Sequence, residues 1–285
     1  MRFAKYHALG NDYLVVEPVG TGSADPLAAL VSRICDRRLG VGADGVLVER
    51  SMPDGRLAVR IVNPDGSEAE TSGNGLRIFA RYLWDGGRVG GEAFEVVTRG
   101  GTVRCQVREA GREVFVEMGS ASFDSAAIPV AGARREVVDE EIEVRGERLR
   151  FTAVTVGNPH CVVFVDVPAA ELARRLGPAL EAHPRFPRRT NVQFVGVLDR
   201  RRIAVEVWER GAGYTLASGS SACAAAAASV RLGLCDADVT VVMPGGELAI
   251  GVGADFSLTL LGPVRKVAEG SVAAELLRDA GAATG

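Results

Sequence analysis

The sequence contains few residues arranged to bind a metal or to form a disulfide framework. Its five cysteines, at positions 35, 105, 161, 223 and 235, show no C-x-x-C or C-x-x-x-C spacing, and its three histidines are widely separated. Zinc sites and disulfide scaffolds need clustered ligands or paired cysteines. We therefore expect no metal site, and free thiols in a reducing compartment.

Long apolar segments and concentrated positive charge are lacking too. No run of about 18 apolar residues occurs, and the opening MRFAKYHALGND has no apolar signal core. The net charge is −3, and the longest basic runs are RRLG and DRRR. These absences argue against a membrane protein and against a nucleic-acid partner, and they favour the cytoplasm. Only two of the 33 basic residues are lysines, which suggests a GC-rich bacterial genome.

The composition that is present suits a globular protein of one large domain or two ordinary ones. Hydrophobic residues make up 47% and charged residues 24% of the 285 positions. The first half predicts helices over 25–38 and 74–85, the first with Asp25 as N-cap and Pro26 at the first helical position. Short strands are predicted over 2–9, 12–17, 45–50, 56–63, 93–99, 101–107 and 112–118.

The second half repeats this arrangement after a segment, 119–140, in which Ser, Ala and Gly dilute the strand pattern. The helix predicted over 219–232 is apolar on all sides and alanine-rich, which is typical of a helix enclosed by strands. We interpret the chain as two pseudo-equivalent α+β domains, 1–120 and 121–285, with the chain's last residues able to pack back on the first. The second half predicts a surface helix over 168–182 and strands over 150–158, 161–167, 190–199, 203–209, 239–246, 247–252 and 256–263.

The segment GVGADG at 40–45 matches the spacing of a dinucleotide-binding loop. That loop follows a strand and opens a helix, whereas here a predicted helix precedes the glycines and a strand follows them. These glycines are better interpreted as a tight helix-to-strand turn, and we expect no nucleotide cofactor.

Two similar turns, TSGNG at 71–75 and ASGSS at 217–221, each stand before a predicted helix. The first N–H groups of a helix have no internal partner and form the positive end of its dipole. With small residues there, each turn could bind a carboxylate or phosphate. Alternatively, Ser72 and Ser218 are simply N-caps. The occurrence of related turns in related halves favours a site.

Other polar residues stand at predicted strand ends. Arg210 offers a planar fork suited to a carboxylate. Together these residues indicate recognition of a small zwitterion or dicarboxylate. They are Asn63, Asn158, His160, Asn191, Glu209 and Arg210.

These motifs resemble the diaminopimelate epimerase family of cofactor-independent racemases and isomerases. The resemblance implies two pseudo-symmetric domains, each a strongly curved, mainly antiparallel sheet wrapped round a central helix, with the active site in the cleft between them. It also implies no cofactor, a small amino-acid-like carboxylate as substrate, and a homodimer. The matching segments are KYHALGNDYLVVE, GVGADGVLVE, NPDGSEAETSGNGLRIFARYL, VGNPHCVVFV, TNVQFV and VWERGAGYTLASGSSACAAAA.

The resemblance also implies roles for individual residues. In the family, two cysteines face opposite sides of the substrate's α-carbon, and here Ser72 and Ser218 occupy their positions. His160 and Glu209 would orient and deprotonate this acid/base pair. The N–H donors to the α-carboxylate would be Gly73, Asn74, Gly219 and Ser220, and the far end of the substrate would meet Asn63, Asn158, Asn191 and Arg210, with Asn11 nearby.

Both catalytic cysteines are therefore replaced, and neighbouring positions differ as well. Thr71 stands where Met is usual, Ile78 where a second Cys is frequent, Tyr214 where Glu is common, and Ser220-Ser221 where Thr-Gly is expected. A serine hydroxyl is a far weaker acid than a thiol, whose pKa is about 8.5, so a serinate base is not accessible at neutral pH. The pattern indicates natural divergence and disfavours the two-base mechanism.

The sequence thus favours an isomerase that shifts a proton or double bond on an amino-acid derivative with a more acidic carbon. Glu209 and His160, with Tyr214 as a further candidate, would move the proton while the serines donate hydrogen bonds. A role in an actinobacterial antibiotic pathway, such as one making alkylproline units, is suggested by resemblance and composition. The alternatives are an amino-acid epimerase of the family's usual type, a Ser–His hydrolase, and a non-catalytic amino-acid-binding homologue.

Overall fold

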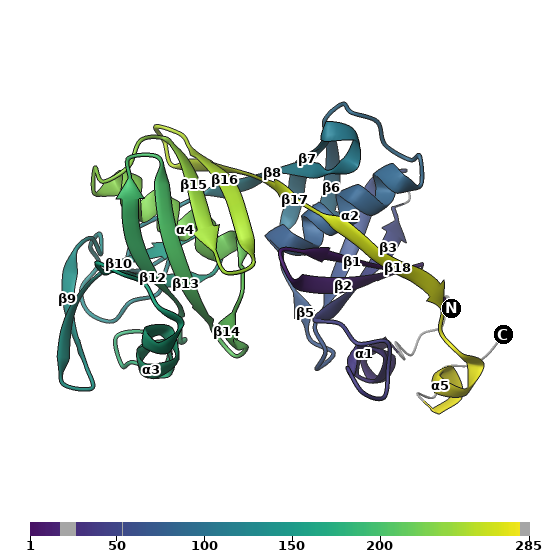
Figure 1. Ribbon diagram of the computed structural model, residues 1–285, viewed down its shortest axis with the longest axis horizontal. Coiled ribbons are helices and arrows are strands. Elements are labelled where there is room, and N and C mark those ends of the chain that lie inside the picture. Colours follow the sequence, from purple (N-terminus) through teal and green to yellow (C-terminus); the bar gives the residue numbers. More distant parts are fainter. Residues whose placement is uncertain (18–26, 53, 280–285) are drawn as a thin grey trace. The chain divides into compact units, whose positions relative to one another are not determined.

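The chain forms two compact units in a computed structural model that describes residues 1–17, 27–52 and 54–279 (Figure 1). The first unit comprises residues 1–116 together with the C-terminal segment from residue 262, and the second comprises residues 117–261. The chain passes from one unit to the other within strand β8 (Glu113–Ser120) and again within β17 (Ser257–Pro263).

The first unit is a mixed sheet with helices packed against it. Its strands pair in the order β18, β1, β2, β3, β4, β6, β7, β8, with short β5 also on β4. Of these pairs, β2/β3 and β4/β6 are parallel and the others are antiparallel. Its remaining elements are β1 (Arg2–Ala8), β2 (Asn11–Val16), α1 (Leu27–Cys35), β3 (Gly45–Ser51), β4 (Leu57–Val62), β5 (Glu68–Ala69), α2 (Gly73–Asp85), β6 (Phe94–Thr98), β7 (Gly101–Arg108), the 3-10 turn η1 (Glu109–Gly111), β18 (Arg265–Ser271) and α5 (Ala274–Asp279).

The second unit has the same strand order. Its strands pair as β9, β10, β11, β12, β13, β15, β16, β17, with short β14 on β13 and with β11/β12 and β13/β15 parallel. Its remaining elements are β9 (Glu140–Val144), β10 (Glu147–Thr155), β11 (Pro159–Phe164), α3 (Ala170–Glu181), β12 (Asn191–Asp199), β13 (Arg202–Glu209), β14 (Gly213–Thr215), α4 (Gly219–Arg231), β15 (Asp238–Met243) and β16 (Gly246–Val252).

The two units correspond element by element. α1 matches α3, α2 matches α4, and the parallel pair β2/β3 matches β11/β12. Parallel pairing in an otherwise antiparallel sheet occurs at the same two places in each unit, which chance similarity does not explain. The predicted fold class, two pseudo-symmetric α+β domains, is confirmed.

Each central helix lies against its sheet and is almost wholly buried. α4 contacts β10, β11, β12, β13, β15 and β16, and its alanines 222 and 224–228 are inaccessible to solvent. Alanine has no atoms beyond Cβ, so strands can approach the helix from several sides. The prediction of an enclosed helix over 219–232 is therefore confirmed, and α2 packs in the same way on β1, β2 and β7.

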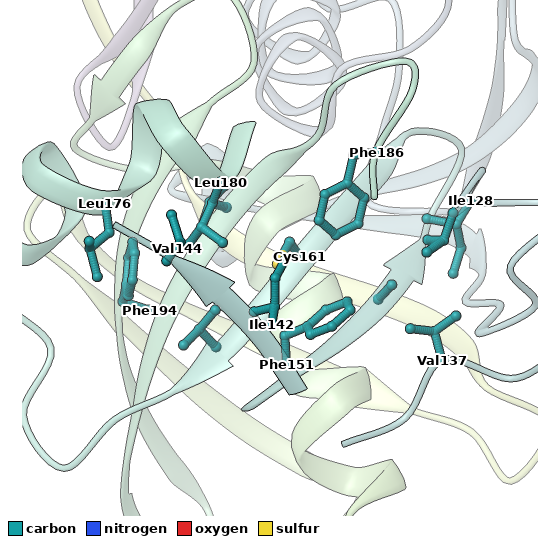
Figure 2. Close-up of a cluster of buried hydrophobic side chains, with 14 of the residues drawn as sticks. Ile128, Val137, Ile142, Val144, Phe151, Cys161, Leu176, Leu180, Phe186 and Phe194 are labelled. Atoms are coloured by element: carbon teal, nitrogen blue, oxygen red, sulfur yellow. The ribbon is translucent and has the colours of Figure 1, made fainter. Parts of the chain in front are cut away.

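The outer helix of the second unit covers a separate part of the core. Figure 2 shows Leu176 and Leu180 of α3 gathered with Phe194 of β12 and other apolar side chains from β9, β10 and β11. Ile128 and Val137 join this cluster from the 119–140 segment, which is irregular but packed. That segment therefore belongs to the second unit's core.

The C-terminal segment belongs to the first unit because β18 pairs antiparallel with β1. Val272, just after β18, is buried among residues of α1, β2 and β3. The division at 116/117 lies four residues before the predicted boundary after residue 120. β5, β9, β14 and β18 were not predicted, and the predicted cap at Asp25 and Pro26 falls outside the described residues. Among the described residues, no helix is long and apolar enough to span a membrane.

Candidate active site

The two serine-led turns adopt nearly identical geometry at the starts of α2 and α4. Ser72 has φ −149° and ψ 117°, and Ser218 has φ −146° and ψ 126°. The Ser72 Oγ accepts a hydrogen bond from the N–H of Gly75 at 3.0 Å, and the Ser218 Oγ accepts one from Ser221 at 3.5 Å. Each serine is thus an N-cap, and its hydroxyl keeps a proton that it can donate.

The predicted anion-binding amides occupy the first two positions of each central helix. Gly73 and Asn74 open α2, and Gly219 and Ser220 open α4. Their N–H groups have no partner within the helix, because intrahelical bonding begins with later residues. Both starts are also largely buried, so the helix dipole is weakly screened there. Each start can therefore bind a carboxylate.

In the first unit, the Asn74 side chain is held by the predicted Asn11. The Asn74 amide donates to the Asn11 Oδ1 at 3.0 Å, and the Asn11 amide donates to the Asp44 Oδ2 at 2.9 Å. Asp44 lies in the GVGADG turn, where a Cβ on Gly40 would come within 2.2 Å of the Arg33 carbonyl oxygen. The turn that resembled a nucleotide loop therefore serves to position Asn11.

A buried cation lies one turn inside α2. Arg77 is completely buried, donates to the carbonyl oxygens of Gly73 at 3.3 Å and Pro263 at 3.1 Å, and hydrogen-bonds the Asn74 Oδ1. Its guanidinium adds positive charge behind the first turn of the helix. Because a buried charge is poorly screened, its positive potential extends to the first turn of α2.

A cluster of ionic groups supports Asp44 and β2. Arg37 makes 2.6 Å contacts with both Asp12 and Asp44, and Lys5 lies 2.9 Å from Asp12. Burial alone would raise the pKa of Asp12, but the hydrogen bonds from Arg37 and Lys5 lower it to about 2. The carboxylate is therefore ionised and structural.

Asn63 lies in the turn between β4 and β5. Its amide donates to the Ser67 Oγ at 2.9 Å, and its backbone N–H bonds the Ser67 carbonyl. This arrangement accounts for an asparagine at the end of a strand. Its assignment to substrate binding stays a prediction.

In the second unit, four predicted residues form one network. His160 and Asn191 are neighbours across the parallel pair β11/β12. The His160 Nε2 lies 2.8 Å from the Asn158 Oδ1, and the Asn191 amide donates to the Pro159 carbonyl at 2.9 Å. The Asn191 Oδ1 accepts the Arg210 backbone N–H at 2.9 Å. Parallel pairing brings these residues together because both strands begin at the same edge.

His160 is buried and uncharged. Burial, followed by the nearby positive charge of Arg210, lowers its pKa to about 3. Its Nδ1 lies 3.0 Å from the Gln193 Nε2, which also donates to the Ser221 Oγ at 3.0 Å. Both ring nitrogens are thus engaged within the second unit.

Glu209 is the last residue of β13 and Arg210 follows it, at a turn that the buried carboxylate of Glu181 holds. The Glu181 Oε2 accepts the Trp208 indole N–H at 2.7 Å, and its Oε1 accepts the Gly211 N–H at 2.9 Å. Glu209 is half-buried, whereas Arg210 is exposed and donates to the Arg188 carbonyl at 3.1 Å. Glu181 therefore holds Trp208 and Gly211, the residues that flank Glu209 and Arg210.

Tyr214 faces a carboxylate. Its hydroxyl donates to the Glu206 Oε2 at 2.7 Å, and the Arg174 guanidinium lies 4.1 Å from its ring centre. Burial, together with the hydrogen bond to Glu206, raises the pKa of Tyr214 to about 12. Its part in proton transfer stays a prediction.

Several residues of the site were not singled out from the sequence. Gln193 and Arg77 are polar residues inside apolar strand and helix patterns, which is the one signal that could have identified them. Asp44 and Glu181 carry no such signal, because acidic residues are common in turns and at helix ends. Among the described residues, no cluster of His, Cys, Asp or Glu could hold a metal.

Comparison with known proteins identifies the family of the chain. The family model for diaminopimelate epimerase matches residues 3–124 and 152–267. A curated relative, diaminopimelate epimerase 2 from Nostoc sp., is 51% identical over 278 residues, covering 97% of each chain.

Solved structures share the fold at low identity. A probable proline racemase from Agrobacterium radiobacter matches with a TM-score of 0.70 and 18% identity over 96% of this chain and 93% of its own. A methylitaconate-Δ-isomerase matches with a TM-score of 0.62 and 13% identity over 95% of both chains. The motifs, the duplicated fold and the family match agree, and the chain belongs to the diaminopimelate epimerase family of epimerases and isomerases.

Proposed function

We propose that this protein is a cofactor-independent isomerase that moves a proton on a small amino-acid-derived carboxylate. The observation that carries the proposal is the matched pair of helix starts led by Ser72 and Ser218. Each hydroxyl already accepts a backbone N–H and retains its proton, so it is a donor rather than a base. The helix starts supply N–H groups for the substrate carboxylate.

The base must be a group other than serine. A hydroxyl cannot deprotonate carbon at neutral pH, whereas a carboxylate can do so when conjugation with an imine or alkene acidifies that carbon. Glu209 carries this role because Glu181 fixes the turn around it. The proton removed from one carbon returns to another position of the same substrate, so no oxidant or cofactor is consumed.

His160 fits the role of a neutral hydrogen-bonding group. Its pKa of about 3 means that the ring carries no charge at pH 7, and both of its nitrogens have partners in the second unit. This modifies the role expected from the sequence, in which His160 shared the work of the base. Glu209 and Tyr214 remain as candidates, and the pKa of Tyr214, raised to about 12 by burial and by its bond to Glu206, favours Glu209 as the base.

Solvent exchange tests the proposal. The purified chain is incubated in D2O with 1-pyrroline-2-carboxylate, a dehydroamino acid and LL-diaminopimelate, and deuterium at carbon is measured by NMR. We expect exchange with at least one conjugated substrate. Glu209→Gln should slow it about 100-fold or more, the range of general-base catalysis. Glu247→Gln, at an exposed side chain of β16 in the same unit, is the matched control.

The serine variants test the division of roles. Ser72→Ala and Ser218→Ala should each slow exchange less than Glu209→Gln does. The proposal fails if either serine variant abolishes exchange while Glu209→Gln retains it.

Epimerisation of diaminopimelate is the second candidate, favoured by 51% identity to a protein of that name across nearly the whole chain. Exchange at the α-carbon of LL-diaminopimelate by the unaltered chain would support it. If only the double variant Ser72→Cys, Ser218→Cys epimerises this substrate, the acid/base pair alone has changed. A homodimer, a cytoplasmic location and an antibiotic pathway stay predictions, and the neighbouring genes would test the pathway.

A further inference from the structure

Gln193 is a buried polar residue in the middle of an apolar strand. It lies on β12 with no exposed surface, and its Nε2 is 3.0 Å from both the His160 Nδ1 and the Ser221 Oγ. Its Oε1 is one of two buried side-chain oxygens without a partner in the described part of the chain. A buried polar atom without a hydrogen bond destabilises the folded state, so this arrangement needs a physical explanation.

The hydrogen-bond count decides which way the amide faces. With Nε2 toward His160 and Ser221, both N–H groups are used and one acceptor is left over. The reverse orientation would leave both N–H groups buried without partners. Unpaired N–H groups are rarer in proteins than under-satisfied carbonyls, so the first orientation is favoured.

This orientation sets the position of the proton on His160. Because the Nδ1 accepts from Gln193, the ring proton must reside on Nε2. The Nε2–H then donates to the Asn158 Oδ1 at 2.8 Å. The Asn158 oxygen is thereby used within the protein. Its amide nitrogen has no hydrogen-bond partner among the described residues.

We propose that Gln193 is a positioning residue that holds His160 as the Nε2–H tautomer and so turns the amide N–H groups of Asn158 toward the substrate. The substrate group at Asn158 is therefore a hydrogen-bond acceptor, a carboxylate or carbonyl oxygen, and not an ammonium group. The Asn191 side-chain oxygen is likewise occupied, by the Arg210 N–H. The part concerning substrate rests on the proposed function, whereas the tautomer does not.

Ser221 completes the arrangement. It stands where the family resemblance leads to an expectation of glycine, and its hydroxyl gives the second N–H of Gln193 an acceptor. Without that oxygen the amide would lose one reason to keep its orientation. The departure from the family pattern is thus connected to the tautomer of His160.

The tautomer is measurable by 15N NMR of the imidazole nitrogens, since the chain has only three histidines. In the unaltered chain we expect a protonated Nε2 and an unprotonated Nδ1 for His160. Gln193→Glu replaces the donor with an acceptor and should place a proton on Nδ1. Gln106→Glu, on a half-buried side chain of β7 in the first unit, is the matched control and should leave the His160 nitrogens unchanged.

Calorimetry tests whether Asn158 meets a hydrogen-bond acceptor of the ligand. The two probes are 2-aminopimelate, which ends in a distal carboxylate, and lysine, which ends in a distal ammonium group. The unaltered chain should bind 2-aminopimelate about tenfold more tightly, the worth of one hydrogen bond to a charged group. Gln193→Glu, and the nearly isosteric Gln193→Met if the first misfolds, should reduce that ratio. The Ser221→Ala variant should reduce the ratio of the two affinities by a smaller factor.

Each outcome bears on the inference separately from the proposed function. A proton on Nδ1 in the unaltered chain, or unchanged His160 nitrogens in Gln193→Glu, overturns it regardless of turnover. A preference for lysine overturns the assignment of the acceptor group. If neither probe binds while the tautomer is as expected, the proposed amino-acid substrate is wrong and Gln193 still positions His160.

Discussion

A single atom separates the side chains of Ser72 and Ser218 from the cysteines implied by the family resemblance. A thiol with a pKa of about 8.5 ionises readily beside a helix N-terminus, whereas a hydroxyl stays protonated there. Both serines accept a backbone N–H from their own helix. At this scale each serine caps its helix but lacks the acidity of a thiol.

His160 should make stability depend on pH. Its pKa is about 3 when folded and near 6.5 when unfolded, so below pH 6.5 only the unfolded chain takes up the proton. The free energy of unfolding therefore falls as pH drops from 7 toward 3, by about 2 kcal/mol at pH 5. Urea unfolding at pH 7 and pH 5 measures this loss.

The matched variants for this measurement are His160→Gln and His183→Gln. The first should remove most of the loss between pH 7 and pH 5, and the second should retain it. Equal losses in the two variants would contradict the burial of a neutral His160.

At the scale of elements, α3 acts on the site through its last residue. Glu181 accepts from Trp208 and Gly211, which flank Glu209 and Arg210. The helix can approach Trp208 because Gly177 has no side chain, and a Cβ there would lie 2.6 Å from the indole. The outer helix thus determines where the end of β13 lies.

Glu181→Gln should reduce turnover because one amide oxygen cannot replace two carboxylate oxygens. One hydrogen bond to a charged acceptor is lost, which costs about 1.5–3 kcal/mol, and the turn loses its fixed position. Thermal unfolding and the kcat of the exchange reaction measure both effects. Glu171→Gln, exposed in the first turn of the same helix, should alter neither. Unchanged turnover in Glu181→Gln would refute its positioning role.

At the scale of the whole molecule, the chain contains two similar units. The C-terminal segment from residue 262 completes the first of them. β18 pairs with β1, Val272 enters the core formed by α1 and its strands, and the Pro263 carbonyl accepts from Arg77. The second unit uses no residue beyond 261. The two copies therefore depend differently on the C-terminal segment.

A chain ending at Leu261 should lose the structure of its first unit and keep that of its second. Removing β18 leaves β1 as an unpaired edge and exposes the core at Val272. Limited proteolysis with mass spectrometry should show cleavage within residues 1–116 and protection within 117–261. Equal protection of both segments would show that the C-terminal segment contributes little.

The local pattern was sufficient to predict most elements and the helix starts. Apolar periodicity located α2, α4 and the longer strands, because burial on one or more faces leaves a direct trace in the sequence. Ser72 and Ser218 were identified as caps or site residues from their turns alone. The edge strand β18 was missed because its residues are exposed and carry no such trace.

What the sequence by itself determined is therefore the family, the duplicated architecture and the positions of the two serine-led helix starts. Only the tertiary structure decided that Glu181 holds the turn at Glu209, that Gln193 faces His160, and that β18 completes the first unit. These contacts join residues that are 27 to 269 positions apart, as from Glu181 to Trp208 and from Arg2 to Ser271. They depend on strand register and side-chain packing, which no local pattern encodes.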